Sequence, residues 1–305
     1  MTVSPPLAAP TRSNRPPRPA GVTASVRAVR GLLTEPCSAL DGLVAAHGRT
    51  FELRAGPARL LVVGDADLVG DVLTGRQERF RWRTAFRNLT IVTGPTAMMV
   101  SDGADHRRRR SLAQPAFARR RIDGWAPLVV READRAIDAL LVGADVDLHE
   151  VMRAVVRRIV VRVLFGEELA ARADEVGAAL APAVAYAGQP VLRQLPHPLP
   201  VGARQEARRA RRRVDRLLDA EIARRRHGPP GERPDVLDAL LAEAAAGPTD
   251  GAGGIDDAEV RDQVVTLIAA GHDTTSAAIS WLLARALTTP GGVEELRDEA
   301  RRAPV

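Results

Sequence analysis

A single long helical segment, from about Asp257 to Leu287, constrains this fold more than any other feature of the sequence. Asp256 precedes it and Glu259 follows three residues later, a capping-box pattern that marks the start of a helix. A Pro-Gly pair at 290 and 291 marks its end. About 30 residues predict a helix of roughly 45 Å, which is long for a globular protein. Residues 264–270 are apolar nearly all round, so we expect this helix to run through a core.

The remaining sequence predicts a mainly α protein with a small β hairpin. The chain has 305 residues, 45% of them hydrophobic, and only 3% are aromatic. It can therefore bury a sizeable core, and strand-like runs are few. Residues 51–54 alternate apolar and polar, residues 60–63 form a short apolar run typical of a buried strand, and Gly56-Pro57 between them indicates a turn. An aspartate at 65 or 67 then predicts a short helix through residue 73.

Proline and glycine clusters define the organisation of the chain. Residues 1–22 hold several prolines among small and basic residues, which predicts a flexible tail. Residues 23–305 are predicted to form one domain, because the later clusters at 187–202, 228–234 and 247–254 separate helices rather than domains.

The charge pattern bears on possible partners. All 44 basic residues are arginine, against 38 acidic residues, for a net charge of +6. Because the acids are interspersed among the arginines, we expect no nucleic-acid binding. The alternative function, from a different class of protein, is a basic helical protein that binds nucleic acid. The arginine-rich segment 204–226 has an apolar stripe at positions 214, 217, 218 and 222, so we expect its charges to face solvent.

Cysteine content and hydropathy indicate the compartment. Cys37 is the one cysteine, which excludes an internal disulfide and a CxxC zinc site and fits a reducing environment. No apolar run approaches the roughly 20 residues that span a bilayer, and no apolar signal segment is present near the N-terminus. The sequence therefore predicts a cytoplasmic protein without membrane association.

Polar residues interrupt the middle of the long helix, at Ala270-Gly271-His272-Asp273-Thr274-Thr275. A helical glycine costs about 1 kcal/mol and a buried unpaired carboxylate costs more, so a purpose other than stability is indicated. Ala270 and Gly271 leave room for a ligand, a hydroxyl at Thr274 or Thr275 can bond the carbonyl one turn earlier, and an acid beside an alcohol can relay protons. The structural alternative is a small-residue packing notch with a satisfied Asp–Thr pair.

A second candidate site lies upstream. Asp102 can cap a helix on which His106 and Arg110 stand at i and i+4 on one face. A guanidinium there can grip a carboxylate in bidentate fashion, with the imidazole as a second donor. We expect residues 107–109, all arginines, to form a solvated basic face.

Together the two motifs resemble the cytochrome P450 family. Members of that family have, midway along a long helix, the pattern Ala or Gly, Gly, any residue, acid, Thr, Thr. Upstream they have a His or Trp, an Arg four residues later and then a Phe, which here is Phe117. The hairpin at 51–63, a helix end at 163–166 and a helix start at 235–237 follow in the same order. The resemblance covers residue 30 to the end and implies the cytochrome P450 fold.

The resemblance also implies chemistry. It implies a haem monooxygenase that inserts one atom of O2 into a small apolar substrate, with haem b as cofactor. Electrons would come ultimately from NAD(P)H through a ferredoxin or flavodoxin type of donor. Segments 83–100 and 170–204 correspond to the regions that select substrate. The implied catalytic residues are Asp273 and Thr274, which handle oxygen and protons. The implied cofactor-binding residues are His106 and Arg110, which hold the haem propionates, together with Ala270 and Gly271.

Two features of the family are not in place. A P450 needs an axial cysteine thiolate, whereas Cys37 lies before the first strand, so we expect no metal ligand in this chain. The family's Glu-x-x-Arg pair is also missing, since the tetrapeptide at 294–297 lies where the family has its J helix. The expectation is a C-terminally truncated P450 domain that ends at the J helix and is inactive by itself. The alternative is a catalytically dead remnant that binds a ligand or partner.

Overall fold

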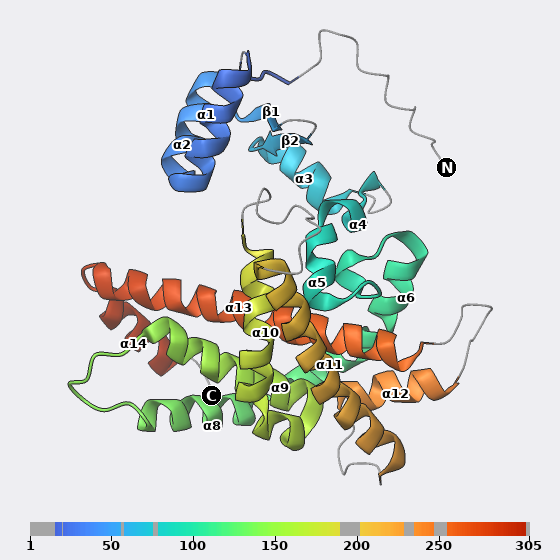
Figure 1. The fold of residues 1–305 in the computed structure, drawn as a ribbon. Helices are drawn as coiled ribbons and strands as arrows, with labels where there is room; N and C mark the ends of the chain where they lie inside the picture. Colours follow the sequence, from blue (N-terminus) through green and yellow to red (C-terminus); the bar gives the residue numbers. More distant parts are fainter. Residues whose placement is uncertain are drawn as a thin grey trace, which may run out of the picture. The chain divides into compact units, whose positions relative to one another are not determined.

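The computed structural model describes residues 16–19, 21–55, 58–75, 79–189, 202–228, 235–246 and 255–302. These residues are mainly helical with one two-stranded sheet, which confirms the predicted fold class (Figure 1). The chain divides into two compact units, Met1–Arg79 and Phe80–Val305. This boundary lies inside the span for which the sequence predicts one domain, and that prediction stays a prediction. The predicted tail over 1–22 falls largely outside the described residues.

The elements of the first unit follow one another closely. They are α1 (Gly21–Thr34), α2 (Pro36–His47), β1 (Thr50–Ala55), β2 (Ala58–Val63) and α3 (Ala66–Thr74). The strands pair antiparallel, with Phe51 opposite Val62, so the hairpin is confirmed, while its turn at 56–57 lies outside the described residues. Asp65 begins α3, where its Oδ1 accepts a hydrogen bond from the Leu68 amide at 3.2 Å.

The hairpin buries one strand better than the other. Phe51 and Leu53 of β1 are 0% and 2% exposed, whereas Leu60 and Leu61 of β2 are 57% and 53% exposed. The interpretation of residues 60–63 as a buried strand is therefore wrong for these two leucines. The reason is that β2 pairs with β1 alone in the described sheet, so its apolar run has no second layer over it.

Short helices open the second unit and long helices follow (Figure 1). The elements are α4 (Trp82–Ala85), η3 (Arg87–Leu89), α5 (Thr90–Thr93), η4 (Met98–Val100), α6 (Gly103–Ala113), η5 (Gln114–Phe117), α7 (Arg119–Asp123), α8 (Ala126–Asp138), α9 (Leu148–Ala171), α10 (Ala173–Ala187), α11 (Ala203–His227), α12 (Val236–Ala246), α13 (Asp257–Thr288) and α14 (Gly292–Arg302).

Helix α13 is the predicted long helix and has 32 residues. Its start is confirmed, because Asp256 Oδ1 accepts a hydrogen bond from the Glu259 amide at 2.7 Å. The N-terminal half is buried, with Val264 and Ile268 each 1% exposed, but Trp281 in the C-terminal half is 77% exposed. The expectation of a core helix is therefore confirmed for the first half only. Among the described residues no helix, α13 included, is both long and apolar enough to cross a bilayer.

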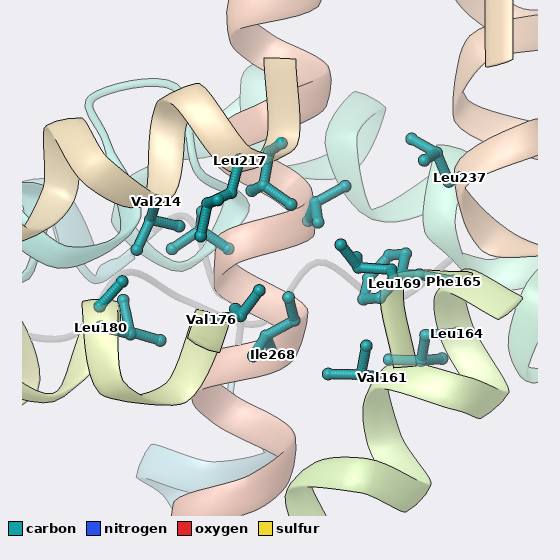
Figure 2. Packing of buried hydrophobic residues seen from close by; sticks show 14 of the residues in the cluster. Val161, Leu164, Phe165, Leu169, Val176, Leu180, Val214, Leu217, Leu237 and Ile268 are labelled. Carbon is teal, nitrogen blue, oxygen red and sulfur yellow. The ribbon is translucent and has the colours of Figure 1, made fainter. Parts of the chain in front are cut away.

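The core of this unit is built where α9, α10, α11, α12 and α13 meet. Apolar side chains from all five helices form one buried cluster, and Figure 2 shows them pointing toward one another. Each such side chain contributes about 1.5–3 kcal/mol when fully buried. The members labelled in Figure 2 are Val161, Leu164, Phe165, Leu169, Val176, Leu180, Val214, Leu217, Leu237 and Ile268.

Helix α11 contributes more than its apolar stripe. The predicted stripe is confirmed, since the residues at 214, 217, 218 and 222 are all buried. The expectation that the charges of this helix face solvent is wrong for Arg211 and Glu221, which are 9% and 8% exposed. Both lie beside the stripe and are buried as ion pairs, which a pattern of apolar positions does not reveal.

Gly166 breaks α9 near its C-terminal end. Its φ of 77° is in the left-handed region, which favours glycine, so the predicted helix end at 163–166 is confirmed as a break. Beside it, Arg225 donates from Nη2 to the Phe165 carbonyl and to Asp235 Oδ2, each at 2.8 Å, and from Nη1 to Asp238 at 2.7 Å. Asp235 directly precedes α12, which confirms the predicted helix start. One arginine therefore joins the break in α9 to the start of α12.

Candidate active site on helices α13 and α6

The polar motif of α13 lies where the helix emerges from the core. His272 is 3% exposed, Asp273 is half-buried, and Thr274 and Thr275 are exposed. The Thr274 hydroxyl donates to the Ala270 carbonyl at 2.7 Å, as predicted for a hydroxyl that bonds one turn back. The expectation that this helix runs through a core does not hold at Thr274 and Thr275, where the helix surface is open. A small molecule can therefore approach it.

Gly271 serves helix packing. A Cβ at this position would lie 3.1 Å from Cγ1 of Val160, which belongs to α9. The missing side chain therefore lets α9 approach α13, as in the packing-notch alternative. The interpretation that Gly271 leaves room for a ligand is wrong on the side of its missing Cβ, because Val160 fills that space.

Asp273 pairs with a cation on α9 and lies beside His272 of its own helix. Its Oδ1 lies 3.5 Å from Arg153 Nε of α9 and 3.7 Å from His272 Nε2. His272 Nδ1 is 2.8 Å from the Ile268 carbonyl, which can only accept, so we assign the imidazole hydrogen to Nδ1. In a neutral imidazole, Nε2 then presents a lone pair toward Asp273. Asp273 and His272 thus lie next to Thr274 along α13, and Arg153 reaches Asp273 from α9.

His106 and Arg110 both lie on α6, as the sequence predicts. His106 is half-buried and Arg110 is exposed. Partial burial and then the Arg110 charge lower the pKa of His106 below its ordinary value. Asp102 occupies the N-cap position, but its carboxylate accepts instead from the amides of Trp82 and Arg83, at 2.6 and 3.3 Å. The predicted capping interaction is therefore wrong, and Asp102 holds the start of α4.

The arginines between these two residues are not a solvated face. Arg109 is 5% exposed and donates from Nε to Glu259 Oε1 at 2.8 Å, while its Nη1 donates to Ser101 at 2.5 Å. Arg108 donates to the same Glu259 oxygen at 2.5 Å. The expectation for residues 107–109 is wrong at 108 and 109. Glu259, the acid that pairs with both arginines, lies in the first turn of α13, so these ion pairs hold α6 against α13.

A second polar network connects α13 to the loop before α6. Asp262 Oδ2 accepts from the Thr96 amide at 3.0 Å and from its hydroxyl at 2.6 Å, and Asp262 Oδ1 accepts from Arg211. Gln263 accepts from the Met98 amide at 2.9 Å. Gly94, with φ 91°, lies so close that a Cβ would be 1.9 Å from Asp262 Oδ1. This network is not among the sequence predictions, although two polar residues at 262 and 263, beside the apolar stretch of a core helix, indicate it.

The structure brings the two helices together but not the two predicted pairs. Helix α6 meets α13 at Glu259, and Asp273 lies 14 residues further, about 21 Å along the helix axis. No hydrogen bond or ion pair in the described part of the chain joins His106 or Arg110 to Asp273 or Thr274. A molecule that touched both pairs would have to be large.

Comparison with known proteins assigns the family. The family described as Cytochrome P450 matches residues 20–303. The chain belongs to the cytochrome P450 family. It is 36% identical over 261 residues to putative cytochrome P450 139 of Mycobacterium tuberculosis, which covers 85% of this chain and 56% of that P450. It is 31% identical over 260 residues to cyclooctatin synthase of Streptomyces melanosporofaciens, covering 83% and 55%. The chain thus spans about half the length of these curated relatives.

Two further relatives add detail. The chain is 30% identical over 244 residues to the protein named cyclooctat-9-en-7-ol 5-monooxygenase, also from Streptomyces melanosporofaciens, covering 78% of this chain and 51% of the relative. A solved structure titled "Retinoic acid bound cyanobacterial CYP120A1" superposes with a TM-score of 0.72 over 89% of this chain and 59% of that one. At 22% identity this likeness shows the P450 fold alone.

The residues of the site fit haem at its carboxylates but not at its iron. His106 and Arg110 offer N–H donors from one helix, and no carboxylate among the described residues accepts from them. Both side chains could therefore donate to the propionate groups of haem. The second unit contains no cysteine, and Cys37 is exposed in the first unit. Among the described residues no three His, Cys, Asp or Glu side chains form a metal site. The donors thus fit the propionates, while the second unit supplies no thiolate for the iron.

Proposed function

We propose that this chain is part of a haem-thiolate monooxygenase that inserts one atom of O2 into an apolar organic substrate. The chain would supply the helix that faces the bound oxygen and the residues that hold the haem propionates. The observation that carries the proposal is the exposed Thr274 hydroxyl beside the half-buried Asp273 on a helix whose other side is packed on α9. Support comes from the relative whose name is cyclooctat-9-en-7-ol 5-monooxygenase, which by that name acts on cyclooctat-9-en-7-ol.

Haem, when bound, would supply oxygen binding and reduction, with electrons drawn ultimately from NAD(P)H through a redox partner. The protein residues would position and protonate. Arg110 and His106 would hold the haem carboxylates, because a guanidinium and an imidazole at i and i+4 donate in the same direction. Ala270, which has only a methyl side chain, would leave its face of α13 open to the cofactor, whereas Gly271 would serve the packing of α9 against α13.

Asp273 and Thr274 would handle protons. The Thr274 hydroxyl already donates its hydrogen to the Ala270 carbonyl, so its oxygen lone pairs remain to accept from a second donor. Asp273 can take a proton from solvent and pass it on, since it is half-buried and borders both solvent and the helix surface. Arg153, 3.5 Å away, would keep this carboxylate oriented between transfers.

The redox partner would be a ferredoxin or flavodoxin type of protein. Exposed arginines of α7, Arg119 and Arg120, follow α6 and would attract an acidic surface. The association rate should then fall steeply as salt is added, and a rate that stays flat with ionic strength contradicts this partner assignment.

Titration of the 305-residue chain with haem tests the proposal, with the Soret absorbance as the readout. We expect binding that weakens about tenfold or more in the double variant His106→Ala/Arg110→Ala, since two charge-assisted contacts are lost. The double variant Arg119→Ala/Arg120→Ala is the control for loss of positive charge and should bind as the parent does. Failure of the parent chain to bind haem, as expected for a catalytically dead remnant, or equal binding by the His106 and Arg110 variant, contradicts the proposal.

A further inference from the structure

Each arginine in the last turn of α11 is paired with an acid. Arg224 and Arg225 both pair with Glu221, and Arg226 pairs with Asp257 at the start of α13. The positive charge at this end of the helix is therefore neutralised by carboxylates of the protein itself.

The middle of the same helix carries positive charge that is not neutralised. Five arginines stand within nine residues, all of them are exposed, and none forms an ion pair with another described residue. Successive residues of a helix are turned by about 100°, so these side chains spread over about 140° of the helix surface, opposite the buried stripe. We refer to this set as the arginine face: Arg208, Arg209, Arg212, Arg213 and Arg216.

The arginine face opposes the stability of the helix. Residues three or four apart on a helix are neighbours, and like charges at that spacing repel each other. Arg208, Arg212 and Arg216 form one row at a spacing of four residues, and Arg209 and Arg213 form a second row. Since all five side chains are exposed, none of them contributes to the core. A cost in stability without a return to the core indicates a function outside the fold.

Carboxylates border the arginine face without neutralising it. Asp215 and Asp219 are both held by Arg261 of α13. Glu206 stands three residues before Arg209, but no ion pair between these two side chains is found in the described structure. The acids that are interspersed among the arginines elsewhere in the sequence are therefore not available here. An acidic ligand would meet five cations without a counter-charge.

We propose that the arginine face is a docking surface for an acidic surface of another protein. Guanidinium groups bind carboxylates in bidentate fashion, which gives direction as well as charge attraction. Four residues of an α-helix rise about 6 Å. Carboxylates four residues apart on a facing helix would therefore have the same spacing as the two rows of the arginine face.

Other polyanions fit this face less well. Between residues 203 and 216 the only apolar side chain larger than alanine is Val214, which is buried. The face thus offers no group on which a base could stack or which could insert into a lipid layer. It spans about 12 Å along the helix axis, and Glu206 and Asp219 lie beyond its two ends. A nucleic-acid duplex or a membrane would extend over these acids, whereas a compact acidic patch would not.

Fluorescence anisotropy of a labelled helical peptide mixed with the 305-residue chain tests the inference. The peptide is alanine-based and has glutamates four residues apart, and its control has glutamines at the same positions. We expect the glutamate peptide to bind at least about tenfold more tightly than the glutamine peptide at low salt, as several exposed ion pairs would give. This advantage should shrink as salt is added, because salt screens exposed charges.

The variant Arg209→Ala/Arg213→Ala/Arg216→Ala should lose at least about tenfold in affinity for the glutamate peptide, since three exposed ion pairs are lost. Its resistance to urea should equal or exceed that of the parent, because like-charge repulsion is removed from the helix. A variant that is clearly less stable than the parent would show that the arginine face serves the fold, which overturns the inference.

The matched control is Arg87→Ala/Arg285→Ala/Arg297→Ala, which removes three exposed arginines from other elements and should keep the peptide affinity. No binding of the glutamate peptide by the parent, equal binding of the two peptides, or an equal loss in the control overturns the inference. Duplex DNA or phosphatidylglycerol vesicles that bind the parent more tightly than the peptide, at equal concentration of anionic groups, also overturn it. The arginine-face variant should bind haem as the parent does, so the docking surface is tested separately from the proposed function.

Discussion

Arg109 Nε of α6 donates to Glu259 Oε1 of α13 at 2.8 Å, and each of the two side chains is less than a tenth exposed. Arg108 donates to the same oxygen, so a single carboxylate fixes two consecutive arginines of α6. Because His106 and Arg110 flank that pair on the same helix, Glu259 also fixes where they stand.

Replacing Glu259 by Gln should destabilise the protein strongly. The substitution leaves the buried Arg109 with only the exposed carboxylate of Asp105, 3.9 Å away, as counter-charge. Breaking a buried pair in this way costs about 3 kcal/mol or more. Urea unfolding measures the loss. Asp298→Asn, which removes an ion pair whose two side chains are 65% and 78% exposed, is the control and should leave the unfolding free energy unchanged. A loss at 259 no larger than at 298 would contradict the structural assignment.

Replacing Gly94 by Ala should cost more than its backbone angle alone explains. The new Cβ would lie 1.9 Å from Asp262 Oδ1, so the carboxylate must move away from Thr96 and Arg211. Gly143→Ala is the matched control, because φ there is 84° and a Cβ would meet nothing within 4 Å. We expect about 1 kcal/mol at 143 from the left-handed angle and at least about 2 kcal/mol more at 94. Equal losses would show that the clash does not matter.

Stability should fall as the pH drops through the range of histidine titration. Burial and the Arg110 charge lower the pKa of His106, so the unfolded chain binds this proton more readily than the folded chain does. The stabilisation is therefore present above about pH 6.5 and is lost as the pH falls toward the folded pKa. Urea unfolding between about pH 7.5 and 5.5 should show a shallower slope in His106→Asn and an intermediate slope in Arg110→Gln. Identical slopes in all three proteins would refute this origin.

Replacing Thr274 by Ala should affect chemistry and spare the fold. Thr274 and Thr288 are both exposed on α13, and each donates to the carbonyl four residues back, at 2.7 and 2.8 Å. Each alanine variant should change the unfolding free energy by less than about 0.5 kcal/mol. In a version of the protein that also carries an axial cysteine and turns over, Thr274→Ala should release more peroxide and less product per NAD(P)H consumed, and Thr288→Ala should not. Unchanged coupling in Thr274→Ala would remove Thr274 from the catalytic pair.

Features set by neighbouring residues could be predicted from the sequence. The Asp256 cap of α13, the Asp65 cap of α3 and the break at Gly166 each depend on residues within a turn or on one backbone angle. Ion pairs that join distant segments could not be predicted, such as that between Arg109 and Glu259. A run of arginines has the same local pattern whether water or a distant carboxylate faces it, so only the packing of α6 on α13 reveals the difference.

The missing side chain of Gly271 was open to two interpretations for a related reason. A small residue in a helix allows the close approach of either a ligand or another helix, and the sequence alone does not distinguish these two cases. The position of Val160 on α9 decides in favour of the helix. In contrast, the candidate pairs Asp273–Thr274 and His106–Arg110 could be predicted from the sequence, because the members of each pair lie about one helical turn apart or less.

The contact between Gly94 and Asp262 also limits how related proteins can diverge. No side chain larger than hydrogen fits at 94 while a carboxylate stands at 262, and that carboxylate is in turn the counter-charge of Arg211. The three positions should therefore covary among relatives. A family member with a side chain at 94 should have exchanged the acid at 262 and, with it, the buried cation at 211.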